Sequence, residues 1–548
     1  MSFINEKTVI ENADLLKPQS MWNADLENGR FSNPVLYTDY SDPDAIRVGD
    51  NYFMIASSFC NAPAIPVLHS KDLVNWKVIN YVLDEIPEAR YKDPIHGCGV
   101  WAPSIRYHEG VYYACFPMPD EGIYMSTTTD PWGEWSKPVN IRPGAGWIDP
   151  CPFWDDDGKA YLVAGVAKSR IGYKSVLHMV EMRPDGMGLI GEEVKIFDGN
   201  LNDQVTIEGP KMYKRNGWYY IFAPAGGVKV GWQTVLRSRN VFGPYEYKVV
   251  MRQGDSPVNG PHQGAWVDTV TGQDWFVHFQ DVYAAGRITH VQPMSWGDDD
   301  WPVIGIAKNG RDYGEPVMEF DKPDVGGVSV QPCEPDTSDD FTSDRLSLQW
   351  QWNANYNKDW YQCTNNGLIL KAAAVEPGKP LGDVSSLLLQ KWPAPEFTCI
   401  TKLDLTGMKD GDTAGIISMG MHYASVSVTK NGDKLTVKAL EGDQEFNGQE
   451  VSTTEAYNTI GEITTDKLWF MYKVERTGYR DINEEEKHTP VETVTLYYSL
   501  DGVNFECCVS CESKAGRWVG VKNGIYCMHE GVSGGHVTAE YVKYIKNQ

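Results

Sequence analysis

Three acidic residues begin similar segments of the chain and are the candidates for catalysis. Asp42 lies in YSDPD, Asp149 in GWIDPCP and Glu208 in TIEGPK. Cleaving a glycosidic bond needs one protonated carboxyl group to assist the leaving oxygen and one ionised carboxylate to activate water or attack carbon. Apolar surroundings such as Ile207 would raise the pKa of Glu208, which suits an acid. Asp42 is the better general base, and we expect Asp149 to orient Glu208 and to keep its pKa high by like-charge repulsion.

These acids belong to a pattern that occurs five times along the chain. The segments are DPDAIRVGDNYFMI from Asp42, APSIRYHEGVYYACF from Ala102, DPCPFWDDDGKAYLV from Asp149, EGPKMYKRNGWYYIF from Glu208 and GAWVDTVTGQDWFVHF from Gly264. Each runs through an apolar strand and a glycine-containing turn to an aromatic-rich second strand, and successive starts lie 60, 47, 59 and 56 residues apart. Repeated four-stranded units predict a five-bladed β-propeller, because its first strands surround one axis and would bring the acids together.

The rest of the chain predicts a second all-β domain. Alternating strands such as AGIISMGMHYASVSVTKNGDKLTVKAL and VTLYYSLDGVNFECCV indicate a β-sandwich of jelly-roll type. The fold class is therefore all-β, a propeller followed by a sandwich. The expected divisions are an N-terminal leader at 1–30 that caps the propeller, the catalytic propeller at 31–320, a Gly-, Pro- and Asp-rich linker at 321–338 and the accessory sandwich at 339–548.

Composition restricts the class of partner. The chain has 548 residues, 49 Lys and Arg against 74 Asp and Glu, and a formal net charge of −25. An acidic surface repels phosphate groups, so neither nucleic acid nor an anionic membrane is expected as a partner, and a neutral oligosaccharide fits. No apolar run is long enough for a transmembrane helix, and the first residues do not form a signal peptide. We expect a cytoplasmic protein, or a secreted one whose signal peptide is not in this sequence. The sequence does not indicate an oligomeric state.

The order and spacing of the motifs resemble a known enzyme family. NPVLYTDYSDPDAIRVGDNYFMIASSF, HSKDLVNWKVI, GVWAPSIRYHEGVYY, DPCPFWDDDGKAYLV, EGPKMYKRNGWYYIFAPAGG and GRITHVQPMSW resemble the blade motifs of glycoside hydrolase family 43, over residues 33–305. The resemblance is strongest to its β-xylosidase and α-L-arabinofuranosidase branch. It implies an inverting mechanism with Asp42 as general base, Asp149 as the pKa-modulating residue and Glu208 as general acid.

The same resemblance implies a set of substrate-binding residues. Arg287, in AAGRITH, corresponds to an arginine that reaches sugar hydroxyls or the base, and the alternative is a salt bridge between blades. Phe59, Trp76 and Trp101 resemble aromatic residues that form the walls of the terminal sugar site, and Trp232 falls in a loop at the pocket rim. Core packing is the alternative for each of these aromatic residues.

Metal binding is implied by the resemblance at two places. His262, in GPHQGAW, corresponds to a histidine that holds Ca²⁺ through water below the catalytic site, although Gln263 departs from the commonest pattern. A buried structural histidine is the alternative. DDF at Asp339–Phe341 and AEY at Ala539–Tyr541 resemble strands near a second, structural ion in the sandwich, where Glu540 replaces a frequent aspartate.

We therefore expect an exo-acting, inverting glycoside hydrolase that releases xylose from the non-reducing end of xylo-oligosaccharides and possesses some activity on α-L-arabinofuranosyl groups. A main activity as an α-L-arabinofuranosidase and a catalytically silent, carbohydrate-binding propeller are the alternatives. A retaining β-fructosidase would carry Asn-Asp-Pro, Arg-Asp-Pro and Glu-Cys motifs. This chain has Lys92-Asp93-Pro94, and its Glu506-Cys507 lies in the second domain.

Overall fold

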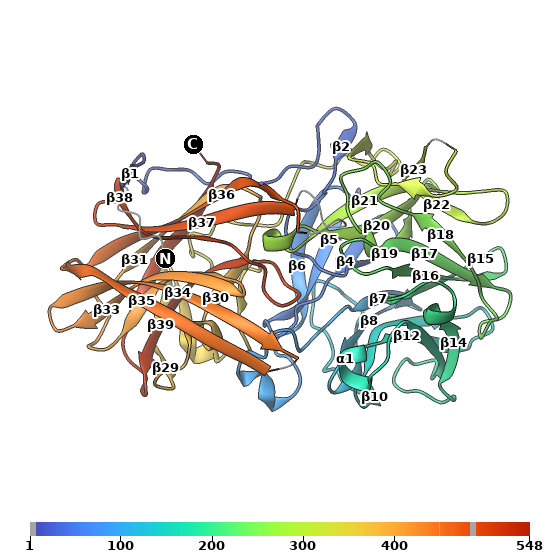
Figure 1. The fold of residues 1–548 in the computed structure, drawn as a ribbon, viewed down its shortest axis with the longest axis horizontal. Coiled ribbons are helices and arrows are strands. Elements are labelled where there is room, and N and C mark those ends of the chain that lie inside the picture. The colour runs from blue at the N-terminus through green and yellow to red at the C-terminus, as the bar shows by residue number, and fades with distance from the viewer. Residues whose placement is uncertain (1–6, 309, 449, 483–488, 548) are drawn as a thin grey trace.

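The structure is a computed structural model that describes residues 7–308, 310–448, 450–482 and 489–547. It consists almost entirely of β-strands arranged in two domains that lie side by side (Figure 1). The propeller forms the right side of the view, in blue to yellow-green, and the sandwich forms the left side, in orange and red. The expected fold class is confirmed.

Five antiparallel sheets make up the propeller, one for each predicted repeat. Blade one contains β3 (Asp44–Val48), β4 (Asn51–Ile55), β5 (Ala64–Ser70) and β6 (Trp76–Leu83), and blade two contains β7 (Ser104–His108), β8 (Val111–Met118), β9 (Gly122–Thr128) and β10 (Val139–Pro143). Blade three contains β11 (Trp147–Trp154), β12 (Ala160–Val166), β13 (Val176–Met182) and β14 (Val194–Asp198). Blade four contains β15 (Lys211–Arg215), β16 (Trp218–Ala225), β17 (Trp232–Ser238) and β18 (Glu246–Met251), extended by β24 (Gly314–Glu315) and β23 (Ile306–Ala307). Blade five contains β19 (His262–Asp268), β20 (Asp274–Asp281), β21 (Arg287–Trp296) and β22 (Pro302–Ile304).

The turn between the first two strands of every blade contains a glycine with positive φ. These glycines are Gly49, Gly110, Gly158, Gly217 and Gly272, with φ between 64° and 86°. Glycine adopts this left-handed conformation without steric cost, so the repeated glycine of the sequence fixes where each hairpin reverses.

Apolar side chains hold adjacent blades together in separate clusters. Phe53 of blade one packs in one cluster with Tyr112 of blade two, and Ala45 of blade one shares another with Val277 of blade five. The second cluster joins the first blade to the last, which closes the ring and fixes the inner strands around a common axis.

The sandwich is built from two large sheets. The first has the order β1-β38-β37-β36-β31-β40-β28-β27 and the second β26-β30-β39-β32-β33-β34-β35, with β29 beside β39. Their bounds are β26 (Gln351–Trp352), β27 (Tyr361–Thr364), β28 (Gly367–Lys371), β29 (Ala373–Val375), β30 (Leu388–Lys391), β31 (Phe397–Asp404), β32 (Thr413–Met419), β33 (His422–Asn431), β34 (Lys434–Asn447), β35 (Glu450–Ile463), β36 (Lys467–Arg480), β37 (Thr489–Ser499), β38 (Asn504–Glu512), β39 (Lys522–Glu530) and β40 (His536–Ile545). Alternate residues of these strands, such as Ile416, Val426 and Phe470, fill the space between the sheets.

The leader differs from the prediction. Strand β1 (Lys7–Val9) does not cap the propeller but pairs antiparallel with β38 of the sandwich, and Ala13 is buried in the sandwich as well. β38 would otherwise be an edge strand with unpaired backbone groups, so β1 covers it. The leader reaches the propeller from Ala24 onward, and β2 (Arg30–Ser32) pairs with β25 (Glu319–Asp321) at the other end of the domain.

Helices are few and short. They are η1 (Ala89–Lys92), α1 (Lys168–Ile171), η2 (Gly199–Leu201), η3 (Tyr283–Ala285), η4 (Lys358–Trp360) and η5 (Leu381–Asp383). Within the described ranges, none of them is long and apolar enough to cross a membrane.

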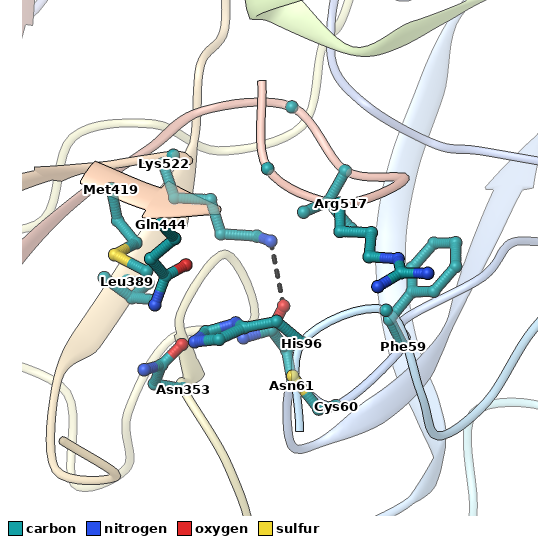
Figure 2. Close-up of a pocket in the computed structure, with 15 residues that line it drawn as sticks. Phe59, Cys60, Asn61, His96, Asn353, Leu389, Met419, Gln444, Arg517 and Lys522 are labelled. Atoms are coloured by element: carbon teal, nitrogen blue, oxygen red, sulfur yellow. Dashed lines mark hydrogen bonds between the residues drawn. The ribbon is translucent and has the colours of Figure 1, made fainter. Parts of the chain in front are cut away.

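Buried polar contacts join the two domains. Lys522 of β39 donates a hydrogen bond from Nζ to Oδ1 of Asn61 in the propeller over 2.8 Å, beside a small cavity between the domains (Figure 2). The Asp39 carboxylate of the propeller accepts the backbone N–H of Gly520 from the sandwich over 2.9 Å. These contacts hold the sandwich loop of residues 513–521 against the face of the propeller that carries the catalytic candidates.

Candidate active site

Backbone conformation places the two aspartates at matching points of their blades. Asp42 and Asp149 have φ of 56° and 55°, and in blade four Gly209 takes this conformation with φ of 59°. A proline follows each of the three, which disfavours the right-handed helical region for the residue before it. Non-glycine residues are uncommon at such φ values and concentrate at functional sites. Glu208 therefore stands one position before the residue that matches the aspartates.

The three acids line one cavity, although they are far apart in the sequence. Asp42, Asp149 and Glu208 surround a space of about 820 Å³, counting the part open to solvent. The cavity lies where the first strands of blades one, three and four begin. The structure thus brings together the residues that the repeat pattern selected.

Several donors hold the Asp42 carboxylate. The hydroxyl groups of Ser41 and Ser57 each donate to Asp42 Oδ2 over 2.6 Å, and Arg287 donates from Nη1 to Oδ1 over 2.9 Å. These donors fix the orientation of the carboxyl group and place a cation beside it. Asp42 is therefore an oriented carboxylate, as a general base requires.

Burial changes the protonation of the other two acids. Desolvation raises the pKa of Asp149 to about 6, although the Gly209 N–H that donates to its Oδ2 over 2.8 Å acts in the opposite direction. Desolvation and, next, the negative charge of Asp149 raise the pKa of Glu208 to about 8. Glu208 therefore holds its proton at neutral pH, and Asp149 contributes to this state.

His262 lies directly behind Glu208. Its Nε2 is 3.6 Å from Glu208 Oε1, and burial lowers the pKa of His262 to about 3. At neutral pH this contact joins a neutral imidazole to a protonated carboxyl group, so it is not a salt bridge. The histidine leaves the proton on Glu208.

Arg287 occupies the centre of the charge network. It begins β21, is 7% exposed, and contacts Asp42 as well as Asp281, whose Oδ2 is 3.9 Å from Arg287 Nε. Its backbone N–H donates to Asp39 Oδ1 over 2.9 Å. Arg287 lines the cavity and contacts Asp42, so the arginine lies where the resemblance places it, although this contact is also an ion pair between blades.

The four aromatic candidates separate into two pairs. Phe59 and Trp101 line the cavity, with ring centroids 6.3 Å apart. The prediction that Trp76 forms a wall of the sugar site is wrong. Its side chain is fully buried in the cluster between blades one and five and donates to Leu73 O. Trp232 does not line the cavity either, since its indole packs against the cluster between blades three and four and donates to Gln204 Oε1 over 2.9 Å.

Trp518 lines the cavity and was not among the sequence candidates. It belongs to the sandwich loop 513–521, is 46% exposed, and its ring centroid lies 5.8 Å from the guanidinium carbon of Arg287. Its φ of 68° is unusual for a bulky residue, and such strain persists only where the surroundings fix it. Trp518 lies outside the repeats, so the pattern that identified the acids carries no signal for it.

The surroundings of His262 bear on the expected calcium ion. The imidazole is 1% exposed, and among the described residues neither of its nitrogens has a hydrogen-bond partner. Buried nitrogens of this kind are commonly satisfied by ordered water. Ca²⁺ takes oxygen ligands, and the described residues contain no group of three His, Cys, Asp or Glu side chains that could hold a metal ion directly. The residues fit an ion here only through water.

The expected second ion does not fit the sandwich. Glu540 forms ion pairs with Lys402 over 3.1 Å and with Lys467 over 2.6 Å. Asp339 accepts the indole N–H of Trp350 over 2.9 Å. The ammonium groups of Lys402 and Lys467 thus already pair with the Glu540 carboxylate, which a Ca²⁺ ion would need as a ligand.

This arrangement can carry out acid–base hydrolysis. A protonated Glu208 can donate to a leaving oxygen, an ionised Asp42 can accept a proton from water, and aromatic rings from both domains form walls for an apolar sugar face. The geometry meets the requirements of glycosidic bond cleavage, because one cavity holds a protonated carboxyl group and an oriented carboxylate.

Comparisons with known proteins agree with this chemistry. Residues 31–302 match the family model described as glycosyl hydrolases family 43, and residues 338–545 match a beta xylosidase C-terminal concanavalin A-like domain. A relative from Xylanibacter ruminicola, named putative beta-xylosidase, is 36% identical over 531 residues, which cover 95% of this chain and 91% of the relative. A relative from Butyrivibrio fibrisolvens, named xylosidase/arabinosidase, is 28% identical over 74% of this chain and 81% of its own length.

A solved structure shares the whole architecture. The GH43 protein BlXynB from Bacillus licheniformis is 25% identical to this chain, with a TM-score of 0.76 over 94% of this chain and 100% of that one. The succession of propeller and sandwich is therefore common to both proteins.

Proposed function

The chain belongs to family 43 of the glycosyl hydrolases, and from this premise we propose that it is an exo-acting β-xylosidase that releases xylose from the non-reducing end of xylo-oligosaccharides. The observation that supports the proposal is the shared cavity of Asp42, Asp149 and Glu208, with Glu208 protonated and Asp42 held as a carboxylate. The name of the Xylanibacter relative supports xylose as the released sugar.

The proposed mechanism is a single displacement. Asp42 takes a proton from a water molecule that attacks the anomeric carbon, while Glu208 gives its proton to the departing oxygen. Asp149 keeps the pKa of Glu208 high, and Arg287 keeps the Asp42 carboxylate in place. Because water attacks directly, the configuration of the sugar inverts.

The aromatic walls of the cavity support exo action. Phe59 and Trp101 of the propeller and Trp518 of the sandwich line the cavity from different sides, which favours one terminal sugar over an internal segment of a polymer. Xylo-oligosaccharides should therefore be better substrates than polymeric xylan, and an endo product pattern on xylan would contradict this part of the proposal.

The rates on p-nitrophenyl β-xyloside and p-nitrophenyl α-L-arabinofuranoside test the substrate. We expect turnover of both, with the higher kcat/KM on the xyloside, and loss of turnover in Glu208→Ala. A clear preference for the arabinofuranoside would assign the main activity to α-L-arabinofuranosidase. Absence of turnover in the wild type would indicate a silent carbohydrate-binding propeller.

We further propose that a calcium ion is held through water at His262. The unpartnered, buried imidazole nitrogens support this, since a bound ion would order the water around them. Treatment with EDTA should lower the Tm and the activity of the wild type, added Ca²⁺ should restore both, and His262→Ala should respond to neither. An unchanged wild type would identify His262 as a structural residue.

A further inference from the structure

We propose that a groove between the two domains binds a carboxylate on the leaving-group side of the substrate, so that the enzyme prefers acidic oligosaccharides in which the second sugar carries a uronic acid. This inference rests on the proposed function, because the groove continues from the catalytic cavity. It adds a charge preference that neither the family assignment nor the relatives' names contain.

The groove and the catalytic cavity share part of their walls. Val228, Arg287 and Trp518 line both spaces, and the groove has a volume of about 1090 Å³, counting the part open to solvent. The terminal sugar occupies the catalytic cavity in an exo-acting enzyme, so the groove is the adjoining space into which the rest of an oligosaccharide can extend.

The groove is lined in part by the blade that carries the proposed acid. Val228 and Lys229 belong to the loop 226–231 between β16 and β17, in the blade that carries Glu208. A general acid stands beside the leaving group, because it must protonate the departing oxygen. A chain that enters the groove is therefore the leaving-group part of the substrate.

The charge of the groove is opposite to that of the whole chain. Its charged lining residues are four cations and one carboxylate, namely Lys229, Arg287, Lys514, Arg517 and Asp281. The protein as a whole has 74 acidic against 49 basic side chains. Arg287 pairs with Asp281 over 3.9 Å and with Asp42 over 2.9 Å, and Lys514 lies 3.8 Å from Asp443. Among these groups four cations stand against three carboxylates, so the excess positive charge is small. The positive charge of the groove attracts anions, whereas the acidic remainder of the surface repels them.

Each domain supplies cations and aromatic rings to the groove. The propeller provides Lys229, whose Nζ lies 5.2 Å from the centroid of the Tyr283 ring. The sandwich provides Arg517, which lies 4.7 Å from the centroid of Phe446 and donates one N–H to Gly448 O. A guanidinium has five N–H donors in a planar fork that suits a carboxylate, and this bond uses one of them. Rings and cations together suit a sugar that bears a carboxylate.

Lys514 is the best position for a test. It is exposed, and its nearest carboxylate is Asp443, 3.8 Å away, with both side chains about half exposed. Such a surface pair contributes little to stability, so a change at Lys514 should leave the fold intact. Lys371, an exposed lysine on β28, provides the matched control because it does not line the groove.

The experiment compares two substrates that differ in one charge. One is a xylo-oligosaccharide with an unsubstituted terminal xylose and a glucuronic acid on the second sugar, and the other is the same compound with its carboxyl group reduced to an alcohol. We expect a kcat/KM about threefold to tenfold higher on the acid form in the wild type, as expected for one or two exposed charge pairs. The preference should decrease as NaCl screens the charges.

Three variants test whether the preference for the acid substrate arises in the groove. Lys514→Glu should remove the preference for the acid form with little change on the reduced form, Lys229→Gln should weaken it, and Lys371→Glu should retain it. Equal kcat/KM on both substrates in the wild type, or an equal loss on both in Lys514→Glu, would overturn the inference. Activity on p-nitrophenyl β-xyloside separates the two proposals. An enzyme that hydrolyses it but has equal kcat/KM on the acid and reduced oligosaccharides would support the proposed function and contradict only the carboxylate-binding groove. An enzyme inactive on all of these substrates would contradict the proposed function.

Discussion

At the scale of single residues, the environment assigns different tasks to chemically similar groups. Asp42 receives two hydroxyl hydrogen bonds and a guanidinium, whereas Glu208 lies partly buried beside a second acid and a neutral imidazole. The first environment fixes the orientation of the Asp42 carboxylate, and the second favours the protonated form of Glu208. Two carboxyl groups in one cavity can thus act as base and acid at the same pH.

The pH dependence follows from Glu208. The pKa of Glu208 is raised to about 8, so kcat/KM should decline as the pH rises through this value and the acid loses its proton. In Asp149→Asn the like charge is absent, so the pKa of Glu208 should decrease and the alkaline limb should move to lower pH. The kcat/KM–pH profiles of both enzymes, measured on one substrate, check this, and an alkaline limb at the same pH in both would be inconsistent with the role of Asp149.

The leaving group provides a second test of Glu208. Glu208→Gln should lower kcat on xylobiose by about 10²–10⁴, the usual contribution of a general acid. The loss on p-nitrophenyl β-xyloside should be smaller, because p-nitrophenolate leaves without protonation. Measuring kcat of the wild type and the variant on both substrates tests this prediction. Equal losses would show that Glu208 does not protonate the leaving oxygen.

At the scale of structural elements, loops shape the cavity that the blades support. Loop 513–521 of the sandwich is held by the Gly520 N–H to Asp39 and by the Val521 N–H, which donates to Ala284 O over 2.7 Å. These bonds fix the backbone after the strained Trp518, and before it the Met421 N–H donates to Ala515 O over 3.2 Å. The accessory domain thereby supplies a wall to a site whose acids all come from the propeller.

Trp518→Ala measures the contribution of this loop. We expect kcat/KM on xylo-oligosaccharides to decrease about tenfold, or about 1.4 kcal/mol, mainly through a higher KM, because a binding surface is removed while the acids remain. Trp132→Ala is the matched control, since Trp132 is also a half-exposed tryptophan but does not line the cavity. A KM unchanged in Trp518→Ala would place the indole outside the substrate site.

The elements were predictable from the sequence to different degrees. The five hairpins and the convergence of Asp42, Asp149 and Glu208 followed from a local pattern of apolar alternation and glycine turns, which needs no knowledge of distant contacts. Trp76 and Trp101 are both tryptophans of the repeats and were both predicted to line the sugar site. Only the packing between blades one and five shows that Trp76 belongs to the core. Trp518 enters the site through the docking of two domains, which no local pattern records.

At the scale of the whole molecule, the two domains form one functional unit. Asp39 joins them, because its carboxylate accepts the backbone N–H of Gly520 from the sandwich and that of Arg287 from the propeller. Arg287 in turn contacts Asp42, so two hydrogen bonds, both made by Arg287, connect Asp39 at the domain interface to the proposed base. The partly buried Lys391 also donates from Nζ to the backbone oxygen of Asp39.

Asp39→Ala should therefore affect stability and activity together. Both acceptors are lost, so we expect two thermal transitions where the wild type should show one, and a kcat/KM about tenfold lower or more, because buried donors lose their partner. Calorimetry and p-nitrophenyl β-xyloside kinetics measure the two effects. Asp336→Ala, which removes an exposed ion pair with Lys77, is the control and should change neither. Two transitions with full activity would show that docking does not support the site.

The central claim is that Glu208 and Asp42 act from opposite sides of the glycosidic bond in a single displacement. The most direct measurement is ¹H NMR of xylose released from p-nitrophenyl β-xyloside, recorded before the anomers equilibrate. The account predicts that α-xylose forms first and that the β-anomer increases only later by mutarotation. If β-xylose forms first, the reaction proceeds with retention and the assignment of Asp42 as general base is contradicted.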